Sequence, residues 1–176
     1  MTTLRNLVAL VLITVSAIAQ DQPRKSDSHA QDLLAAAQTD RSLGMFVAAV
    51  RSSGLAKVLR EEGSLTVFAL SNQAFASLHK DQLEALLKHP PALHFLLARY
   101  IVPGTVLSDD ADHWTSARTL AGVKLRADLR SEGTYVNGAK LGHQPIRGSN
   151  GAVYILNTID LALVQESLDL VRSDNR

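Results

Sequence analysis

Thr66-Val-Phe-Ala-Leu-Ser-Asn-Gln-Ala-Phe75 is the stretch that decides the fold of this chain. It begins as a run of β-branched and aromatic residues, which is typical of a strand. It then reaches Ser71 and Asn72, two residue types that favour the first turn of a helix. The sequence therefore predicts a strand that turns directly into a helix carrying Ala74 and Phe75.

A second stretch of the same kind, Gly151-Ala-Val-Tyr-Ile-Leu-Asn-Thr-Ile-Asp160, lies near the end of the chain. Its apolar run also predicts a strand that is ended by polar residues. We expect Phe68 and Phe75 from the first stretch to pack with Tyr154 or its neighbours from the second, because both runs need one shared core to cover them.

Most of the chain before Tyr100 predicts short helices. Apolar residues between positions 43 and 50 are spaced as on one face of a helix, and Gly54 is expected to end that helix in the left-handed conformation. Pro90 and Pro91 stop one helix and begin the next.

Two further helix starts are predicted from capping patterns. Ser28 and Gln31 have the spacing of a capping box, and so do Asp81 and Glu84. A terminal stretch from position 163 also has helical spacing; it is expected either to pack back on the domain or to capture a partner.

From Tyr100 onward the pattern changes to strands. Residues 123–128 alternate apolar with charged side chains, which predicts a half-exposed strand with Lys124, Arg126 and Asp128 on its wet face. Asn137-Gly138 predicts a type I′ hairpin turn. Helices first and strands later, without regular alternation, predict an α+β fold.

These motifs together resemble the fasciclin-like (FAS1) domain over roughly residues 29–164. The resemblance implies a wedge of β-strands flanked by several short helices, and a non-catalytic role in adhesion or in binding at the cell surface or in the matrix. The motif positions are expected to be mainly structural. They are Thr66, Phe68, Asn72, Ala74, Phe75, Tyr100, Asn137, Gly138, Asn150, Gly151 and Asn157.

The chain departs from the family pattern at two places. Family members typically have Tyr-His where this chain has Tyr100-Ile101, so any polar partner of that imidazole must pair elsewhere, and the exchange is either a functional divergence or a neutral repacking. The Asp-Ile pair implicated in integrin recognition by some animal relatives is replaced by Pro145-Ile146. Integrin binding through that carboxylate is therefore not expected.

The N-terminus predicts an export signal. Arg5 precedes an apolar run at 7–15, and Ala17-Ile-Ala19 has the A-x-A form of a cleavage site. We expect residues 1–19 to be a signal peptide, 20–28 a flexible lead-in, 29–164 the domain, and 165–176 a tail or short helix. The protein is then secreted or periplasmic, without stable membrane insertion after cleavage; an uncleaved membrane anchor is the alternative.

Composition limits the partners. The formal net charge is +1, and the 176 residues include no cysteine. Near-neutrality gives no general reason to expect nucleic acid or an acidic membrane as partner, and an exported chain without disulfides must be held together by packing alone. The expected partners are an extracellular protein or a polysaccharide, and the oligomeric state is left open.

One segment is a candidate ligand site from the residues themselves. Ser108-Asp-Asp-Ala-Asp-His-Trp114 gathers acidic side chains beside the only tryptophan. Carboxylates suit a cation and an indole suits a sugar ring, so the alternative function is a periplasmic small-molecule, glycan or cation binder. A solvated surface loop is the plainer interpretation. The candidate residues are Asp109, Asp110, Asp112, His113 and Trp114.

No catalytic, metal or cofactor site is predicted. The chain has no G-x-S-x-G elbow and no thiol, and its histidines lack the spacing of a zinc site. They are His29, His79, His89, His94, His113 and His143. An unrecognised enzyme is kept as a third, weaker possibility.

Overall fold

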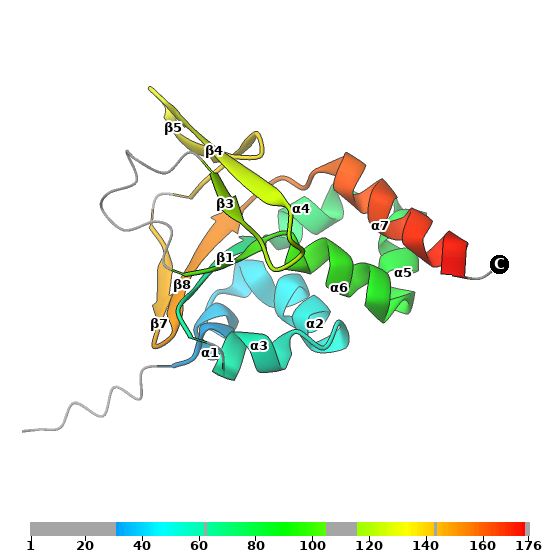
Figure 1. Ribbon diagram of the computed structural model, residues 1–176, viewed down its shortest axis with the longest axis horizontal. Helices are drawn as coiled ribbons and strands as arrows, with labels where there is room; N and C mark the ends of the chain where they lie inside the picture. Colours follow the sequence, from blue (N-terminus) through cyan, green and yellow to red (C-terminus); the bar gives the residue numbers. More distant parts are fainter. Residues whose placement is uncertain (1–30, 62, 105–115, 143, 175–176) are drawn as a thin grey trace, which may run out of the picture.

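The computed structural model describes residues 31–61, 63–104, 116–142 and 144–174. Within them the fold is α+β, as predicted: helices are packed beside two β-sheets (Figure 1). The helical elements are α1 (Leu33–Gln38), the 3₁₀ turn η1 (Arg41–Leu43), α2 (Gly44–Ser52), α3 (Ala56–Glu61), α4 (Asn72–Ala76), α5 (Lys80–Lys88), α6 (Pro90–Ala98) and α7 (Leu161–Asp174). The strands are β1 (Leu65–Leu70), β2 (Ile101–Pro103), β3 (Ser116–Arg118), β4 (Lys124–Arg130), β5 (Gly133–Val136), β6 (Ala139–Lys140), β7 (Ile146–Gly148) and β8 (Gly151–Leu156).

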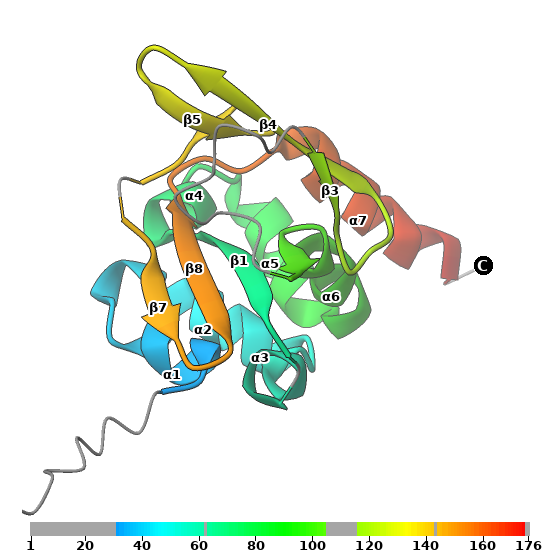
Figure 2. The same ribbon diagram turned by 60° about the vertical axis from the view of Figure 1, so that its left-hand side comes forward.

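The first sheet joins the two stretches that the sequence singled out. Its strand order is β2-β1-β8-β7, and β1 and β8 run parallel, side by side (Figure 2). Phe68 lies opposite Tyr154, and the two rings stack with centroids 5.9 Å apart. Both rings and Phe75 belong to one buried hydrophobic cluster. The predicted shared core is therefore confirmed.

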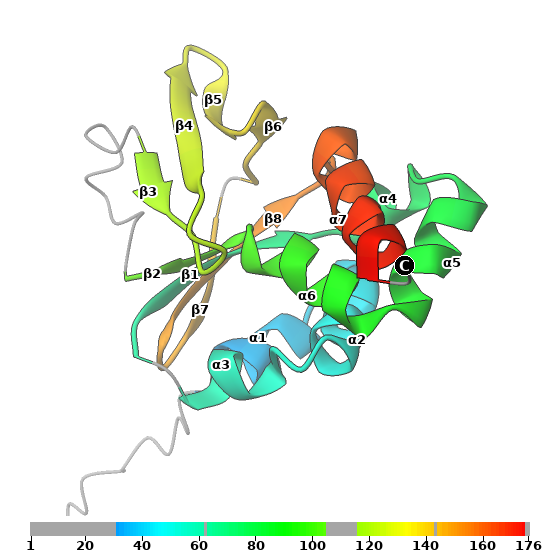
Figure 3. The ribbon, with the colours of Figure 1, turned by 45° about the vertical axis from the view of Figure 1, so that its right-hand side comes forward.

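The second sheet, in the order β3-β4-β5-β6, lies at the opposite end of the molecule from α1 and α3 (Figure 3). The predicted alternation in β4 is confirmed, because Leu125 and Ala127 are buried while Lys124, Arg126 and Asp128 are exposed. Residues 137 and 138, between β5 and β6, have φ angles of 48° and 81°, as a type I′ turn requires.

Two of the predicted helix caps are wrong. α1 begins at Leu33 and is capped by Asp32, whose carboxylate accepts a hydrogen bond from Ala35 N at 2.7 Å; Ser28 lies outside the described residues. α5 begins at Lys80, before Asp81, and Gln82 accepts from His79 N at 3.3 Å. In both cases a polar side chain at the start of the helix accepts a hydrogen bond from a backbone N–H that has no partner within the helix.

The last helix packs back on the domain. Val164 and Leu168 of α7 are buried, and α7 contacts α5 and α6. The buried Arg99 forms an ion pair with Glu166 at 2.6 Å and lies over the ring of Phe95. α7 thus crosses position 164, at which we expected the domain to end. No helix in the described ranges is long and apolar enough to span a bilayer.

Tyr100 links the end of α6 to the start of α7. Its side chain is 2% exposed, and its hydroxyl accepts a hydrogen bond from Asp160 N at 3.3 Å. Burial disfavours the phenolate and raises the pKa of Tyr100 to about 12.

Gly151 of β8 lies close against the backbone of Leu65 in β1. Its φ is +143°, and a Cβ placed there would lie 1.9 Å from Leu65 O. We expect Gly151→Ala to lower the free energy of unfolding by at least about 3 kcal/mol, because strain and a backbone clash act together. Urea unfolding measures the loss, with Gly63→Ala, which has open space around it, as the control. Equal midpoints for the two variants would contradict the close approach.

The buried Tyr100 predicts a loss of stability in alkali. The unfolded tyrosine releases its proton near pH 10, whereas the folded one keeps it up to about pH 12. Between these values the unfolded state is favoured, so about 2–3 kcal/mol of stability should be lost as the pH rises. Urea unfolding at each pH should give a shallower decline for Tyr100→Phe than for wild type. Tyr135→Phe should flatten the decline less than Tyr100→Phe does, because the pKa of Tyr135 is also raised but its hydroxyl is exposed to solvent. Equal slopes for all three proteins would contradict the assignment.

Candidate functional site

A groove of about 530 Å³ lies between the β5–β6 turn and the start of α7. The turn residues 136–139 form one wall, and residues 158–162 form the other. Tyr100 closes the groove between them. Three of the family motif positions, Tyr100, Asn137 and Gly138, therefore meet here although they are distant in sequence.

Three of the polar side chains that line this groove, those of Tyr100, Asn137 and Asp160, are hydrogen-bonded to backbone N–H groups. Tyr100 accepts from Asp160 N, and the Asn137 side chain accepts from Arg126 N at 3.1 Å. The Asp160 carboxylate accepts from Ala162 N at 2.9 Å. Leu161 is 55% exposed at the rim. The described lining thus provides shape and an apolar rim, and these three polar groups are already engaged with backbone N–H groups.

The outer face of the second sheet is a different kind of surface. Cross-strand register places Arg118 opposite Lys124, and Tyr135 opposite both Asp128 and Lys140. Side chains two residues apart on a strand share a face, so these strands present their basic residues on one side. We call this surface the basic face: Arg118, Lys124, Arg126, Arg130 and Lys140, all exposed.

Two motif asparagines act as long-range clamps. Asn72 was expected to cap the helix after β1, but Ser71 caps that helix, accepting from Ala74 N. The side chain of Asn72 instead accepts from Met45 N and donates to Arg41 O, so it caps α2. Asn150 accepts from Leu33 N and donates to Leu59 O, which ties the β7–β8 turn to α1 and α3.

The remaining motif positions lie mostly in or beside the first sheet. Thr66 is buried and donates to Gly104 O at 2.9 Å. Ile101, where the family has histidine, is fully buried and lies opposite Val67. Among the described side chains, the only buried polar atom without a partner is Nε of Arg99, so the exchange to Ile101 strands no polar side chain there. Asn157 is exposed just after β8.

The predicted acidic site, at Asp109, Asp110, Asp112, His113 and Trp114, lies outside the described residues. So do three of the histidines, His29, His113 and His143. Within the described part of the chain, no three His, Cys, Asp or Glu side chains gather as a metal site would require.

The basic face is the feature that sequence reasoning missed. The sequence predicted Lys124 and Arg126 on the wet face of one strand, but not that cations of the neighbouring strands would share that face. The signal in the sequence is the alternation of apolar and charged residues in β4. The Asn137-Gly138 turn then brings Lys140 opposite Tyr135, on the same face.

Comparison with known proteins identifies the fold. The fasciclin domain profile matches residues 41–160. The pig transforming growth factor-beta-induced protein ig-h3 is 30% identical over 120 residues, which is 68% of this chain but 18% of that protein. Protein sll1483 of Synechocystis is 29% identical over 134 residues, covering 75% of this chain and 74% of that one. The chain therefore spans about a fifth of the length of the mammalian relative.

A solved structure agrees. The FAS1 domain pair from the insect cell adhesion molecule fasciclin I superposes with a TM-score of 0.58 at 12% identity, over 76% of this chain and 52% of the pair. The matched motifs, the parallel β1–β8 pairing and the family profile lead to one conclusion: the chain belongs to the fasciclin domain family.

Proposed function

We propose that this protein is an exported, non-catalytic binding module that attaches to a protein or polysaccharide at the cell surface or in the extracellular matrix. The observation that carries the proposal is the fasciclin domain over residues 41–160. The insect protein that shares the fold is named as a cell adhesion molecule, which supports the same class of role here.

The use of the polar motif residues supports a binding role. The side chains of Asn72, Asn150 and Thr66 form hydrogen bonds with backbone groups of distant elements. Such side chains hold a scaffold and leave recognition to exposed surfaces. The groove below Leu161 and the basic face are two such surfaces, and contact through them needs no covalent chemistry. A single module binds with modest strength, so clustering would raise its avidity.

We expect the purified chain to be retained on at least one cell-surface fraction. The fractions are cell-wall polysaccharide and extracellular protein from the organism that encodes it, fixed to beads. Retention should disappear for chain that has been heat-unfolded, because binding depends on the folded surface. Absence of retention on every fraction would refute the proposed role.

The acidic segment 108–114 offers the alternative function, and Trp114 reports on it directly. Because Trp114 is the only tryptophan, its fluorescence isolates this segment. Titration with Ca²⁺ and with short neutral glycans separates the two ideas. A saturable change at micromolar ligand, without surface retention, would favour the small-ligand binder over the adhesion module.

Export is the premise of an extracellular role. We expect the mature protein to begin at Gln20, because the A-x-A site ends at Ala19. Mass spectrometry of the protein from culture medium and from periplasmic and cytoplasmic fractions measures both the terminus and the location. A chain starting near Met1 in the cytoplasmic fraction would contradict export, and Ala19→Lys should block cleavage if the site is correct.

A further inference from the structure

We propose that the basic face of the second sheet binds an acidic polysaccharide, with Lys124 and Arg126 at the centre of the contact. This inference rests on the proposed function, which it deepens by assigning the surface and the class of ligand.

Charge is concentrated on this face. Five cationic side chains share it, whereas the acidic residues on or beside it, in the part of the chain that the structure describes, are Asp128 and, in the β4–β5 turn, Glu132. Asp128 lies 3.8 Å from Arg130, and Glu132 accepts from the hydroxyl of Tyr135. Among the described residues, Lys124, Arg126 and Lys140 have no acidic side chain within 4 Å. These three cations are available to an external anion.

The arrangement suits a linear polyanion. Lys124 and Arg126 are two residues apart on β4, so their attachment points are separated by about 7 Å along the strand. Arg118 is directly opposite Lys124 on β3, about 5 Å away at Cβ. Lys140 of β6 lies across Tyr135 from Asp128, so it is diagonal to Arg126 and Arg130, the next residues of β4 on the same face. Guanidinium groups pair with carboxylate and sulfate through two parallel hydrogen bonds, which favours a chain of such groups lying across the sheet.

Other polyanions fit this face less well. Single-stranded nucleic acid is held by stacking of bases on aromatic rings. Tyr135, the aromatic residue in the described part of this face, has the guanidinium of Arg130 over its ring at 4.3 Å. A membrane-binding surface usually adds apolar side chains that enter the lipid, but the exposed large apolar residues of the described chain are Leu87, Leu161 and Leu170, all on helices. A polysaccharide needs neither feature.

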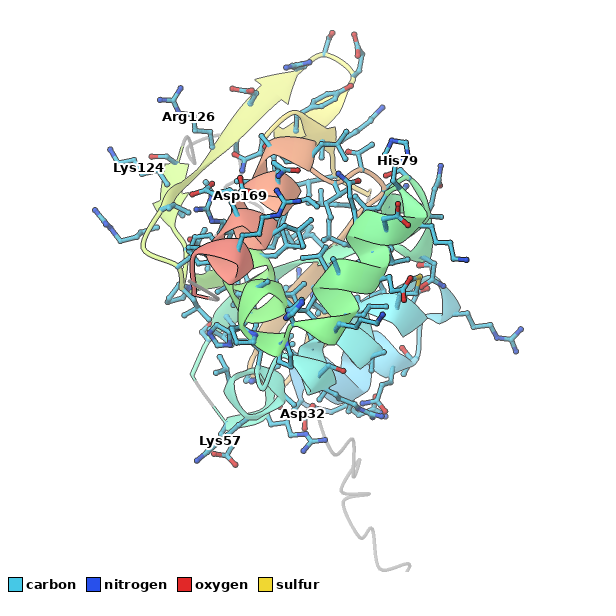
Figure 4. The ribbon with its side chains drawn as sticks, turned by 90° about the vertical axis from the view of Figure 1, so that its right-hand side faces the viewer. Asp32, Lys57, His79, Lys124, Arg126 and Asp169 are labelled. Atoms are coloured by element: carbon cyan, nitrogen blue, oxygen red, sulfur yellow. The ribbon has the colours of Figure 1, made fainter. Side chains whose placement is uncertain are left out.

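The rest of the molecule has a smaller share of positive charge than the basic face. The formal net charge of the whole chain is +1, so an excess of cations on one face leaves the remaining surface close to neutral or acidic. A polyanion is therefore drawn to one side of the protein. Figure 4 shows Lys124 and Arg126 projecting from the second sheet, with Lys57 of α3 far from both.

Binding to sodium polygalacturonate and to chondroitin sulfate, with neutral dextran as the reference, tests the inference. The full mature chain is titrated by isothermal calorimetry at several salt concentrations. The variant K124Q/R126Q should bind both acidic polymers at least about tenfold more weakly, and with a shallower salt dependence, since two cations near an anionic surface are removed. The control K57Q/R60Q loses the same charge from α3 and should bind as wild type does.

The possible results are distinct. Equal weakening by both double variants would overturn the inference, because net charge alone would then explain binding. Tighter binding to a single-stranded oligonucleotide or to anionic vesicles than to either polysaccharide would also overturn it. Retention on a cell-surface protein fraction without affinity for acidic polymers would overturn this inference and leave the proposed function standing. Equal circular dichroism spectra and melting temperatures establish that each variant is folded.

Discussion

The parallel pairing of β1 with β8 is the constraint on which the rest of the structure depends. Parallel neighbours cannot be joined by a tight turn, so everything between them, including the whole second sheet, has to leave β1 and return to it. The two strands meet so closely at Leu65 and Gly151 that a glycine is required there. Phe68 and Tyr154 are opposite each other on this strand pair and their rings stack, and residues of the helices belong to the same buried core.

The elements that the sequence predicted correctly are those whose signals are local. A glycine at φ +80° after α2, two prolines at the start of α6, and an Asn-Gly turn act within a few residues, so their effect is visible in the chain itself. The caps show the opposite case. Asn72 has the chemistry of a cap, but its partners are Arg41 and Met45, and only the tertiary fold brings them within reach. The residue type predicts that such a side chain will form hydrogen bonds with backbone groups. It does not predict which helix will provide those groups.

The candidate surfaces differ in the same way. Both walls of the groove contain predicted motif positions, but the groove exists because the β5–β6 turn and the start of α7 come together around Tyr100. The basic face depends on register: Arg118 is opposite Lys124 only because β3 and β4 pair as they do. A shift of β4 by one residue would turn its three cations, Lys124, Arg126 and Arg130, toward the core side. Composition averages over both faces, so a nearly neutral chain gave no sign of this segregation.

A division between scaffold and contact surface follows from where the polar groups are used. The side chains of Asn72, Asn150 and Thr66 are hydrogen-bonded to backbone groups of distant elements, and replacing them would loosen the packing of those elements. On the basic face, the hydrogen bond of Arg118 to Gly122 O and the ion pair of Arg130 with Asp128 are local, and they join no distant elements. Exposed charges of this kind contribute little to folding stability. The second sheet can therefore carry a ligand-specific charge pattern on its outer side while the first sheet keeps the fold, and the two roles are separable by substitution.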